Sequence, residues 1–304
     1  MEHKGERPAA VFAAAMGSVV LFALTAPLTR AITGDIDPLL LGMRPAAAAL
    51  VAVPLIAALR LRGPRNRHEW TLLALSASSS FVAFPLLFTL GQARTSATHG
   101  ALIQAAMPIF TGLAVAIVER RRPGAFWWLG AALAFLGEGI LFAFRGGTGH
   151  EATLGGDLLV LAASALSASA YVAGARLSAL IGALSATLWC VGIGGLVLMP
   201  FAVIRIPMVD WSRFGVGDLI AVATLAYGPN LTAFIAWFWA LHTGGVQRVA
   251  VFQFAVPPLS VLIAIFFLGE QLTPSLVLAL ALVLGGIAIA RLRSRGLTQP
   301  RVAG

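Results

Sequence analysis

Two glutamines, each four residues before a proline, are the polar groups best suited to bind a small molecule. Gln104 precedes Pro108 and Gln253 precedes Pro257, both inside apolar stretches. Because proline has no N–H, the carbonyl four residues earlier loses its helical partner. Each glutamine thus combines a side-chain amide with a freed backbone carbonyl. Both lie inside an apolar segment, where polar groups are costly and usually functional. The pattern predicts hydrogen bonding to a polar or zwitterionic substrate and hinges at both prolines. Interhelical packing and a simple kink are the alternatives.

Three other side chains of the first half are candidates for a functional role. His99 stands near the start of the predicted helix that holds Gln104, where a histidine binds substrate, carries a proton or marks the membrane interface. Glu138 is the only carboxylate well inside an apolar stretch, so it is the candidate for proton coupling. Arg44 either holds a substrate carboxylate or extends towards the membrane surface.

The second half offers aromatic and amide side chains for the same predicted binding site. Tyr171 and Trp237 lie within apolar stretches and are predicted to form an aromatic wall, although tryptophan in membrane helices also marks interfaces. Asn230 follows Pro229, which indicates a second polar site at a broken helix.

The composition is that of a polytopic membrane protein. Of 304 residues, 59% are hydrophobic and 11% are charged, and the mean hydropathy is +0.90, whereas soluble domains carry about 25% charged residues. Apolar runs of about 20 residues match the hydrocarbon core of a bilayer. The net charge of +9 lies in short loops and the C-terminal tail, so it indicates topology rather than a nucleic-acid surface. The single cysteine, Cys190, has no partner for an internal disulfide.

Ten helices are predicted, in an all-α chain. The apolar run that begins at Ala9 resembles a signal peptide, but it is long enough to span a bilayer and completes the repeat described below. The Gly-rich, polar segment 145–156 separates two five-helix halves, 1–150 and 151–304. The predicted helices cover 8–32, 38–61, 69–92, 96–118 and 125–144 in the first half, and 157–178, 182–204, 218–242, 245–268 and 274–290 in the second.

With five helices per half, the second half must enter the membrane upside down relative to the first. Sorting the 21 Lys and Arg residues by predicted loop places fifteen on the side of both termini, five on the other side and one, Arg44, within a span. This excess predicts cytoplasmic termini. Residues 120–122 are Arg-Arg-Arg, whereas the equivalent residues 271–273 are Gln-Leu-Thr, as inversion requires. Inverted repeats are typical of secondary transporters with a substrate site near the midplane.

Each half also ends its fourth helix at a glutamate that stands four residues before a proline. In the second half Gly269 precedes Glu270, whereas Glu119 has no preceding glycine. With these motifs, nearly the whole chain resembles the drug/metabolite transporter superfamily, and within it the ten-helix EamA-type branch, which includes bacterial amino-acid and metabolite exporters. The resemblance implies a central cavity lined by the odd-numbered helices of each half and by their fourth helices. It leaves the substrate open, because the branch spans amino acids, purines, sugars and quaternary-ammonium drugs.

We therefore expect a multi-pass secondary transporter of the bacterial inner membrane that exports small metabolites by alternating access, with apolar or aromatic amino acids as the favoured substrates. A multidrug or quaternary-cation exporter is the first alternative, and a channel or lipid flippase the second. Proton antiport and facilitated diffusion both stay open. No nucleophile–base pair or metal-ligand cluster is apparent in the sequence, so no enzymatic activity, cofactor or metal is expected. The expected partners are a small-molecule substrate and membrane lipid, with a homodimer left open.

Overall fold

The structure, a computed structural model, is helical throughout the part of the chain that it describes. The described residues are 8–34, 36–118, 124–143, 153–210, 212, 214–244, 252 and 255–292. Six segments of 21 to 28 residues are long and apolar enough to cross a membrane, and three shorter apolar helices accompany them. The predicted all-α, polytopic membrane fold is confirmed.

The first half contains five segments, three of them broken once and one passing through a π-helical turn. The elements are α1 (Pro8–Ala23) and α2 (Thr25–Ile32), α3 (Pro38–Gly42) and α4 (Pro45–Ala58), α5 (Arg67–Ala77), η1 (Ser78–Ala83) and α6 (Phe84–Gln92), α7 (Ala97–Ala105) and α8 (Met107–Val118), and α9 (Ala125–Ala143).

The second half repeats this order with longer unbroken helices at its start. The elements are α10 (Leu154–Ile181), α11 (Ala183–Arg205) with the short η2 (Ile206–Met208), α12 (Val216–Tyr227), η4 (Gly228–Thr232) and α13 (Ala233–Gly244), α15 (Val256–Leu268), and α16 (Pro274–Leu292). In both halves the third segment contains a π-helical turn, η1 and η4, with a proline in it or just after it. Such turns widen a helix locally and are frequent at functional sites.

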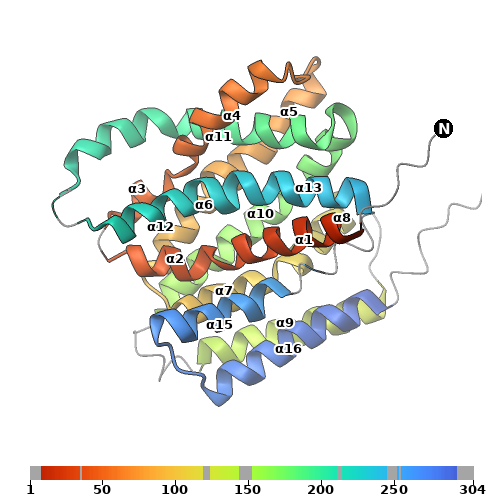
Figure 1. The fold of residues 1–304 in the computed structure, drawn as a ribbon. Coiled ribbons are helices and arrows are strands. Elements are labelled where there is room, and N and C mark those ends of the chain that lie inside the picture. Colours follow the sequence, from red (N-terminus) through yellow and green to blue (C-terminus); the bar gives the residue numbers. More distant parts are fainter. Residues whose placement is uncertain are drawn as a thin grey trace, which may run out of the picture.

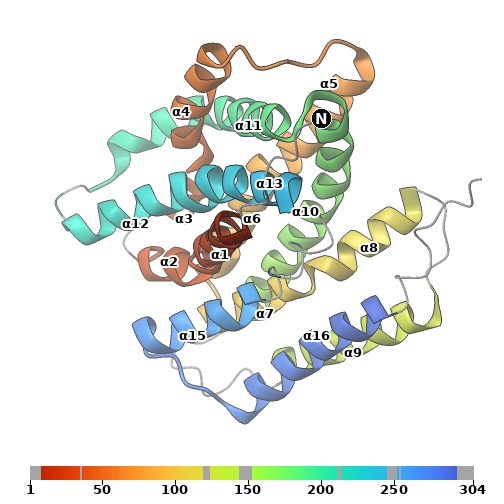
Figure 2. The ribbon, with the colours of Figure 1, turned by 45° about the vertical axis from the view of Figure 1, so that its right-hand side comes forward.

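The two halves are inverted relative to one another. Helix α1 begins and α16 ends on one side of the molecule, which we call the terminal end (Figure 1). Helix α8 also ends and α9 begins there, whereas α15 ends and α16 begins on the opposite side, which we call the Glu270 end (Figure 2). The equivalent helix ends of the two motifs therefore lie at opposite ends of the molecule (Figure 2). Helices α9 and α16 pack side by side, and the close approach of Gly286 to the Gly130 carbonyl leaves no room for a side chain.

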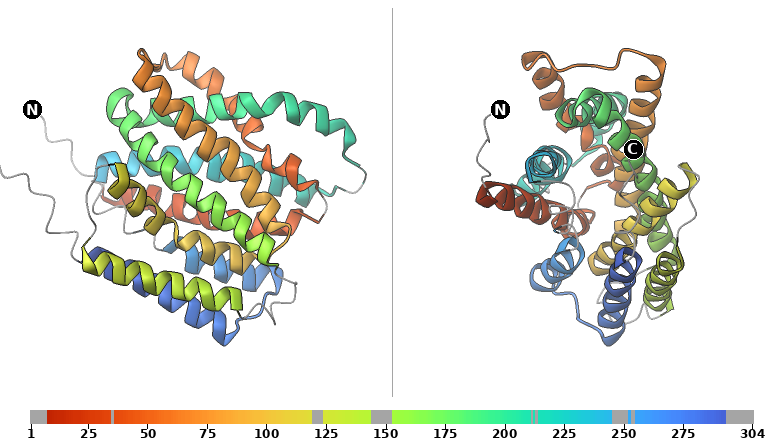
Figure 3. Two further views of the ribbon diagram at one scale, coloured as in Figure 1. Left: turned by 180° about the vertical axis from the view of Figure 1, so that it is seen from behind. Right: turned by 90° about the vertical axis from the view of Figure 1, so that its right-hand side faces the viewer.

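Packing crosses the sequence boundary between the halves. Helix α10 of the second half packs mainly on α5, α6 and α8 of the first, and α1 of the first half packs on α13 of the second. The view from behind in Figure 3 shows α10, in green, running alongside α5 and α6, in orange. The division at residue 150 therefore separates sequence repeats but not packing units.

The fourth segment is bent close to its proline. Helix α7 ends at Ala105 and α8 begins at Met107, immediately before Pro108. The missing proline N–H explains why the helix is interrupted at this point. Helix α7 packs against α15, α10 and α2, whereas α8 packs mainly against α10 and leads away from α15 (Figure 2).

Candidate functional site

The candidate site is built around the first turn of α7, at the Glu270 end. Ser96 caps the helix, because its Oγ accepts the backbone N–H of His99 at 3.2 Å. The two preceding backbone N–H groups, of Ala97 and Thr98, donate to the Glu270 carboxylate at 2.7 and 2.9 Å. All three amide groups of this turn are thus satisfied, two of them by a residue 172 or 173 positions away.

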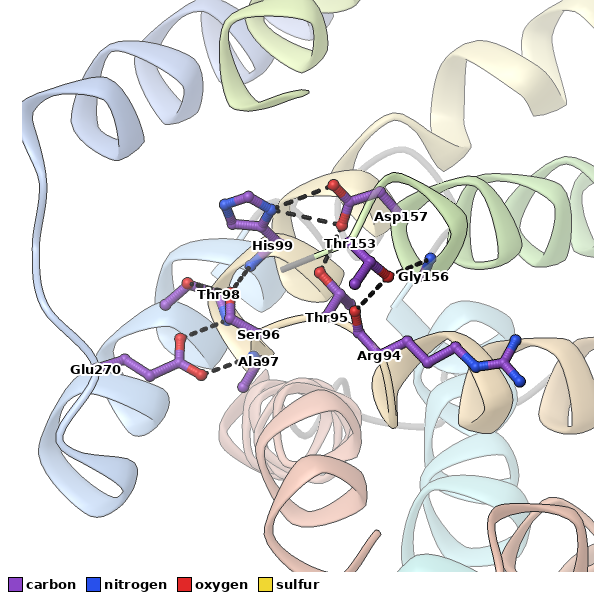
Figure 4. Close-up of polar contacts among 10 residues, drawn as sticks. All are labelled: Arg94, Thr95, Ser96, Ala97, Thr98, His99, Thr153, Gly156, Asp157 and Glu270. Carbon is purple, nitrogen blue, oxygen red and sulfur yellow. Dashed lines mark hydrogen bonds and ion pairs between the residues drawn. The ribbon is translucent and has the colours of Figure 1, made fainter. Parts of the chain in front are cut away.

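A second carboxylate, that of Asp157 in the first turn of α10, contacts the same part of α7. Thr95 Oγ1 donates to Asp157 Oδ1 at 2.5 Å, and His99 Nδ1 lies 3.4 Å from Oδ1 and 3.5 Å from Oδ2. These three side chains are buried. Figure 4 shows Asp157 and Glu270 reaching the start of α7 from different directions.

The start of α10 is positioned by the turn between α6 and α7. Thr153 caps α10 by accepting the Gly156 N–H at 3.1 Å, and its hydroxyl donates to the Arg94 carbonyl at 2.8 Å. Gly156 allows this approach, since a Cβ there would lie 2.6 Å from the Arg94 carbonyl oxygen. The Arg94 side chain points away from the cluster (Figure 4).

Gln104 lies in the last turn of α7, at the break predicted from Pro108. Its Nε2 is buried and has no hydrogen-bond partner within the described residues. Gly100, one turn earlier on the same face of α7, packs against the side-chain amide of Gln92. Gln92 is fully buried on α6; its Nε2 donates to the Ala26 carbonyl at 3.3 Å, and its Oε1 has no partner in the described part.

Arg44 is buried and does not extend to the membrane surface, which answers one of the two alternatives raised by the sequence. It is 5% exposed at the break between α3 and α4, and its Nη1 donates to Thr89 Oγ1 at 2.8 Å and to the Leu41 carbonyl at 3.4 Å. Its Nε has no partner in the described part, as is also true of Thr29 Oγ1 on α2. Among the described residues, four of the five buried side-chain atoms without a partner therefore belong to α2, α6, α7 and the α3–α4 break.

The candidates of the second half are not brought to the start of α7. Asn230 Nδ2 donates to the Leu225 carbonyl at 2.8 Å, within its own segment. Pro229 has no N–H to reach that carbonyl, so Asn230 repairs the proline break. Trp237 is 6% exposed and packs among α1 residues, with its ring 6.4 Å from that of Phe22. Tyr171 is half-buried on α10.

Several predicted residues cannot be placed as side chains. Gln253 lies outside the described residues, and so do the side chains of Glu138 and Pro108, whose backbones belong to α9 and α8. Pro257 lies in the first turn of α15 as described, where a missing N–H has no cost. The hinge and proton-coupling roles therefore stay predictions.

Two buried carboxylates were missed as site residues. Asp157 and Glu270 stand at helix ends in the sequence, where acidic residues are normally solvated, and only the fold brings both to α7. The available signal was Gly269 before Glu270: Gly269 has a φ of 66° and ends α15 in a left-handed cap, which turns the next side chain back towards the bundle. Among the described residues, no three His, Cys, Asp or Glu side chains gather as metal ligands would.

Inverted helical repeats, interrupted segments and buried polar groups within apolar segments define this molecule as a membrane transporter. Residues 9–143 and 154–292 each match the EamA-like transporter family, so the chain belongs to that family. The two matches coincide with the two predicted repeats.

Known proteins of similar sequence carry transporter names. The chain is 29% identical to "Uncharacterized transporter YdeK" of Bacillus subtilis (strain 168) over 276 residues, which cover 90% of this chain and 94% of that protein. It is 25% identical over 253 residues to a "Probable terminal-alkyne amino-acid exporter" of Streptantibioticus cattleyicolor, covering 82% and 81%. A crystal structure with 22% identity has a TM-score of 0.63 and covers 96% of this chain and 100% of its own; it supports the fold.

Proposed function

We propose that this transporter exports amino acids with apolar or aromatic side chains by alternating access, and that it binds their backbone groups beside Gln104. The observation that carries the proposal is the buried Gln104 Nε2, which has no acceptor among the described residues. An unsatisfied buried amide is costly, and polar side chains inside membrane segments mark substrate paths. A substrate carboxylate would supply the missing acceptor.

Gln92 offers a complementary atom on the neighbouring helix. Its Oε1 accepts no hydrogen bond in the described part, and Gly100 places the Gln92 amide against the face of α7 that also carries Gln104. An α-amino acid has an ammonium donor and a carboxylate acceptor on adjacent carbons and so matches both amides. A quaternary-ammonium cation has neither an N–H donor nor an acceptor, so these groups favour the amino acid. The relative named as an amino-acid exporter is in line with this choice.

The direction of transport and the orientation in the bacterial cytoplasmic membrane belong to the same proposal. The excess of arginine on the side of both termini supports cytoplasmic termini. The Glu270 end would then face outward, and the terminal end inward. Export follows if substrate enters from the cytoplasm.

Counterflow of labelled amino acids into liposomes that hold the pure protein tests the proposal. We expect labelled leucine or phenylalanine to accumulate against an unlabelled internal pool, with saturation, whereas a labelled quaternary amine does not. Gln104→Ala should lower the exchange rate at least tenfold without lowering thermal stability, because no internal hydrogen bond of Nε2 is lost. Thr111→Ala is the matched control, since that hydroxyl is already bonded to the Met107 carbonyl at 2.9 Å.

Each alternative has its own result in this assay. Exchange of the quaternary amine but not of amino acids would show that the substrates are cations. Flux that does not saturate would indicate a channel. A wild-type rate in Gln104→Ala would reject the binding site. Running each arm with and without a pH gradient shows whether protons drive transport, and Gln253→Ala extends the test to the predicted equivalent in the second half.

A further inference from the structure

Glu270 joins the two inverted repeats at the Glu270 end of the bundle. It follows the left-handed cap at Gly269, so the chain reverses and the side chain turns back onto α7. The carboxylate is 4% exposed and accepts one backbone N–H on each oxygen, from Ala97 at 2.7 Å and from Thr98 at 2.9 Å (Figure 4). A carboxylate at a helix N-terminus is stabilised both by charge-assisted hydrogen bonds and by the helix dipole.

The Glu270 contact differs from the Asp157 contact on the same helix turn. Asp157 connects the start of α7 to α10, and α10 packs along α5, α6 and α8 of the first half. Glu270 ties α7 to the turn between α15 and α16, and α15 packs against α1, α2 and α7. A movement that separates α7 from α15 would break the Glu270 contact and leave the Asp157 contact intact.

Helices α7 and α15 close the bundle at this end. Ala101 and Leu102 of α7 form one apolar cluster with Val261 of α15 and Ala26 of α2, and all four are buried. Beyond the break at residue 106, α8 packs mainly on α10 and leads away from α15 (Figure 2). The structure is therefore tightly packed where Glu270 acts, on the side that the arginine distribution predicts to be outside.

We propose that Glu270 is the positioning residue that holds the outer gate of this carrier shut, and that its carboxylate must leave the α7 N-terminus before the outward-open state can form. The inference rests on the proposed carrier function and on cytoplasmic termini. The exposed α7 amides and the freed carboxylate are hydrated when the gate opens, which keeps the energetic cost of opening moderate. Removing the negative charge weakens the closed state and shifts the population outward.

The test measures how often the outer gate opens, by labelling a buried cysteine from outside. Val261→Cys introduces a reporter of slightly smaller volume into the α7–α15 cluster, in a background in which Cys190 is replaced by alanine. The protein is reconstituted in liposomes, in the orientation that exposes the Glu270 end, and treated with a membrane-impermeant maleimide. Glu270→Gln should raise the labelling rate at least tenfold, because the negative charge is lost and the glutamine amide keeps an acceptor for only one of the two backbone N–H groups, while its NH2 group faces the other. Glu270→Asp keeps the charge on a shorter side chain, so its labelling rate should lie between those of the parent protein and Glu270→Gln.

Asp157→Asn is the matched control, because it alters the other carboxylate at the same helix turn without touching the α15 side. Its labelling rate should stay within twofold of the parent. Unchanged labelling in folded Glu270→Gln and Glu270→Asp proteins would overturn the gate, and so would equal acceleration by Asp157→Asn. If Glu270→Gln fails to fold, Glu270→Asp alone is compared with the parent. Labelling requires no substrate, so an error in the proposed substrate would not by itself give unchanged labelling in the Glu270 variants.

Discussion

The buried carboxylate of Asp157 allows a quantitative test of how α10 is held against α7. It accepts from Thr95 at 2.5 Å and lies 3.4 Å from His99 Nδ1, and none of the three residues is more than 1% exposed. Asp157→Ala leaves two polar side chains buried without this partner, and each unsatisfied group costs about 1–3 kcal/mol. We expect a loss of about 4 kcal/mol, which at about 2–4 °C per kcal/mol lowers Tm by about 8–16 °C.

Thermal unfolding of the purified protein in detergent, followed by tryptophan fluorescence, measures this loss. The double variant Asp157→Ala/His99→Ala should be less destabilised than the sum of its single variants by about 1–2 kcal/mol, because both sides of one contact disappear together. Asp218→Ala is the control: it is also a first-turn aspartate, on α12, and it accepts the Gly215 N–H at 2.9 Å within its own helix. We expect a cost of about 1 kcal/mol there. Strictly additive losses, or equal losses at the two aspartates, would refute the buried network.

Three further variants separate packing from substrate contact in the second half. Trp237→Ala should cost about 3–5 kcal/mol by opening a cavity against α1, whereas Trp239→Ala, at a side chain 45% exposed, should change stability by less than about 0.5 kcal/mol; similar losses in thermal unfolding would contradict this placement. Asn230→Ala should cost about 1–3 kcal/mol because it leaves the Leu225 carbonyl, which Pro229 cannot serve, without a donor. An unchanged Tm with a raised KM for transport would instead place Asn230 at the substrate.

Local chemistry explains what could be predicted of this fold. Apolar runs of spanning length predict membrane segments, and a proline removes a helical donor wherever the segment lies, so the break before Pro108 could be placed within two residues. The fold class and the family are confirmed. The role of Asn230 also has a local cause, since its partner Leu225 is five positions earlier in the same segment. The sequence does not show that the Asn230 amide donates to this freed carbonyl, and the binding role of Asn230 stays a prediction.

The sequence by itself determined the transmembrane repeats, their inversion and the break before Pro108, because hydropathy, arginine counts and proline act along a single segment. It singled out His99 and Gln104 but not what surrounds them. Only the tertiary structure decided that Asp157 reaches His99 and that Glu270 caps α7, since these residues lie 58 and more than 170 positions from their partners. Such contacts depend on how helices cross and on the exchange of α1 and α10 between the halves. Packing of apolar surfaces sets that arrangement, and many pairings of equally apolar helices are compatible with one sequence pattern.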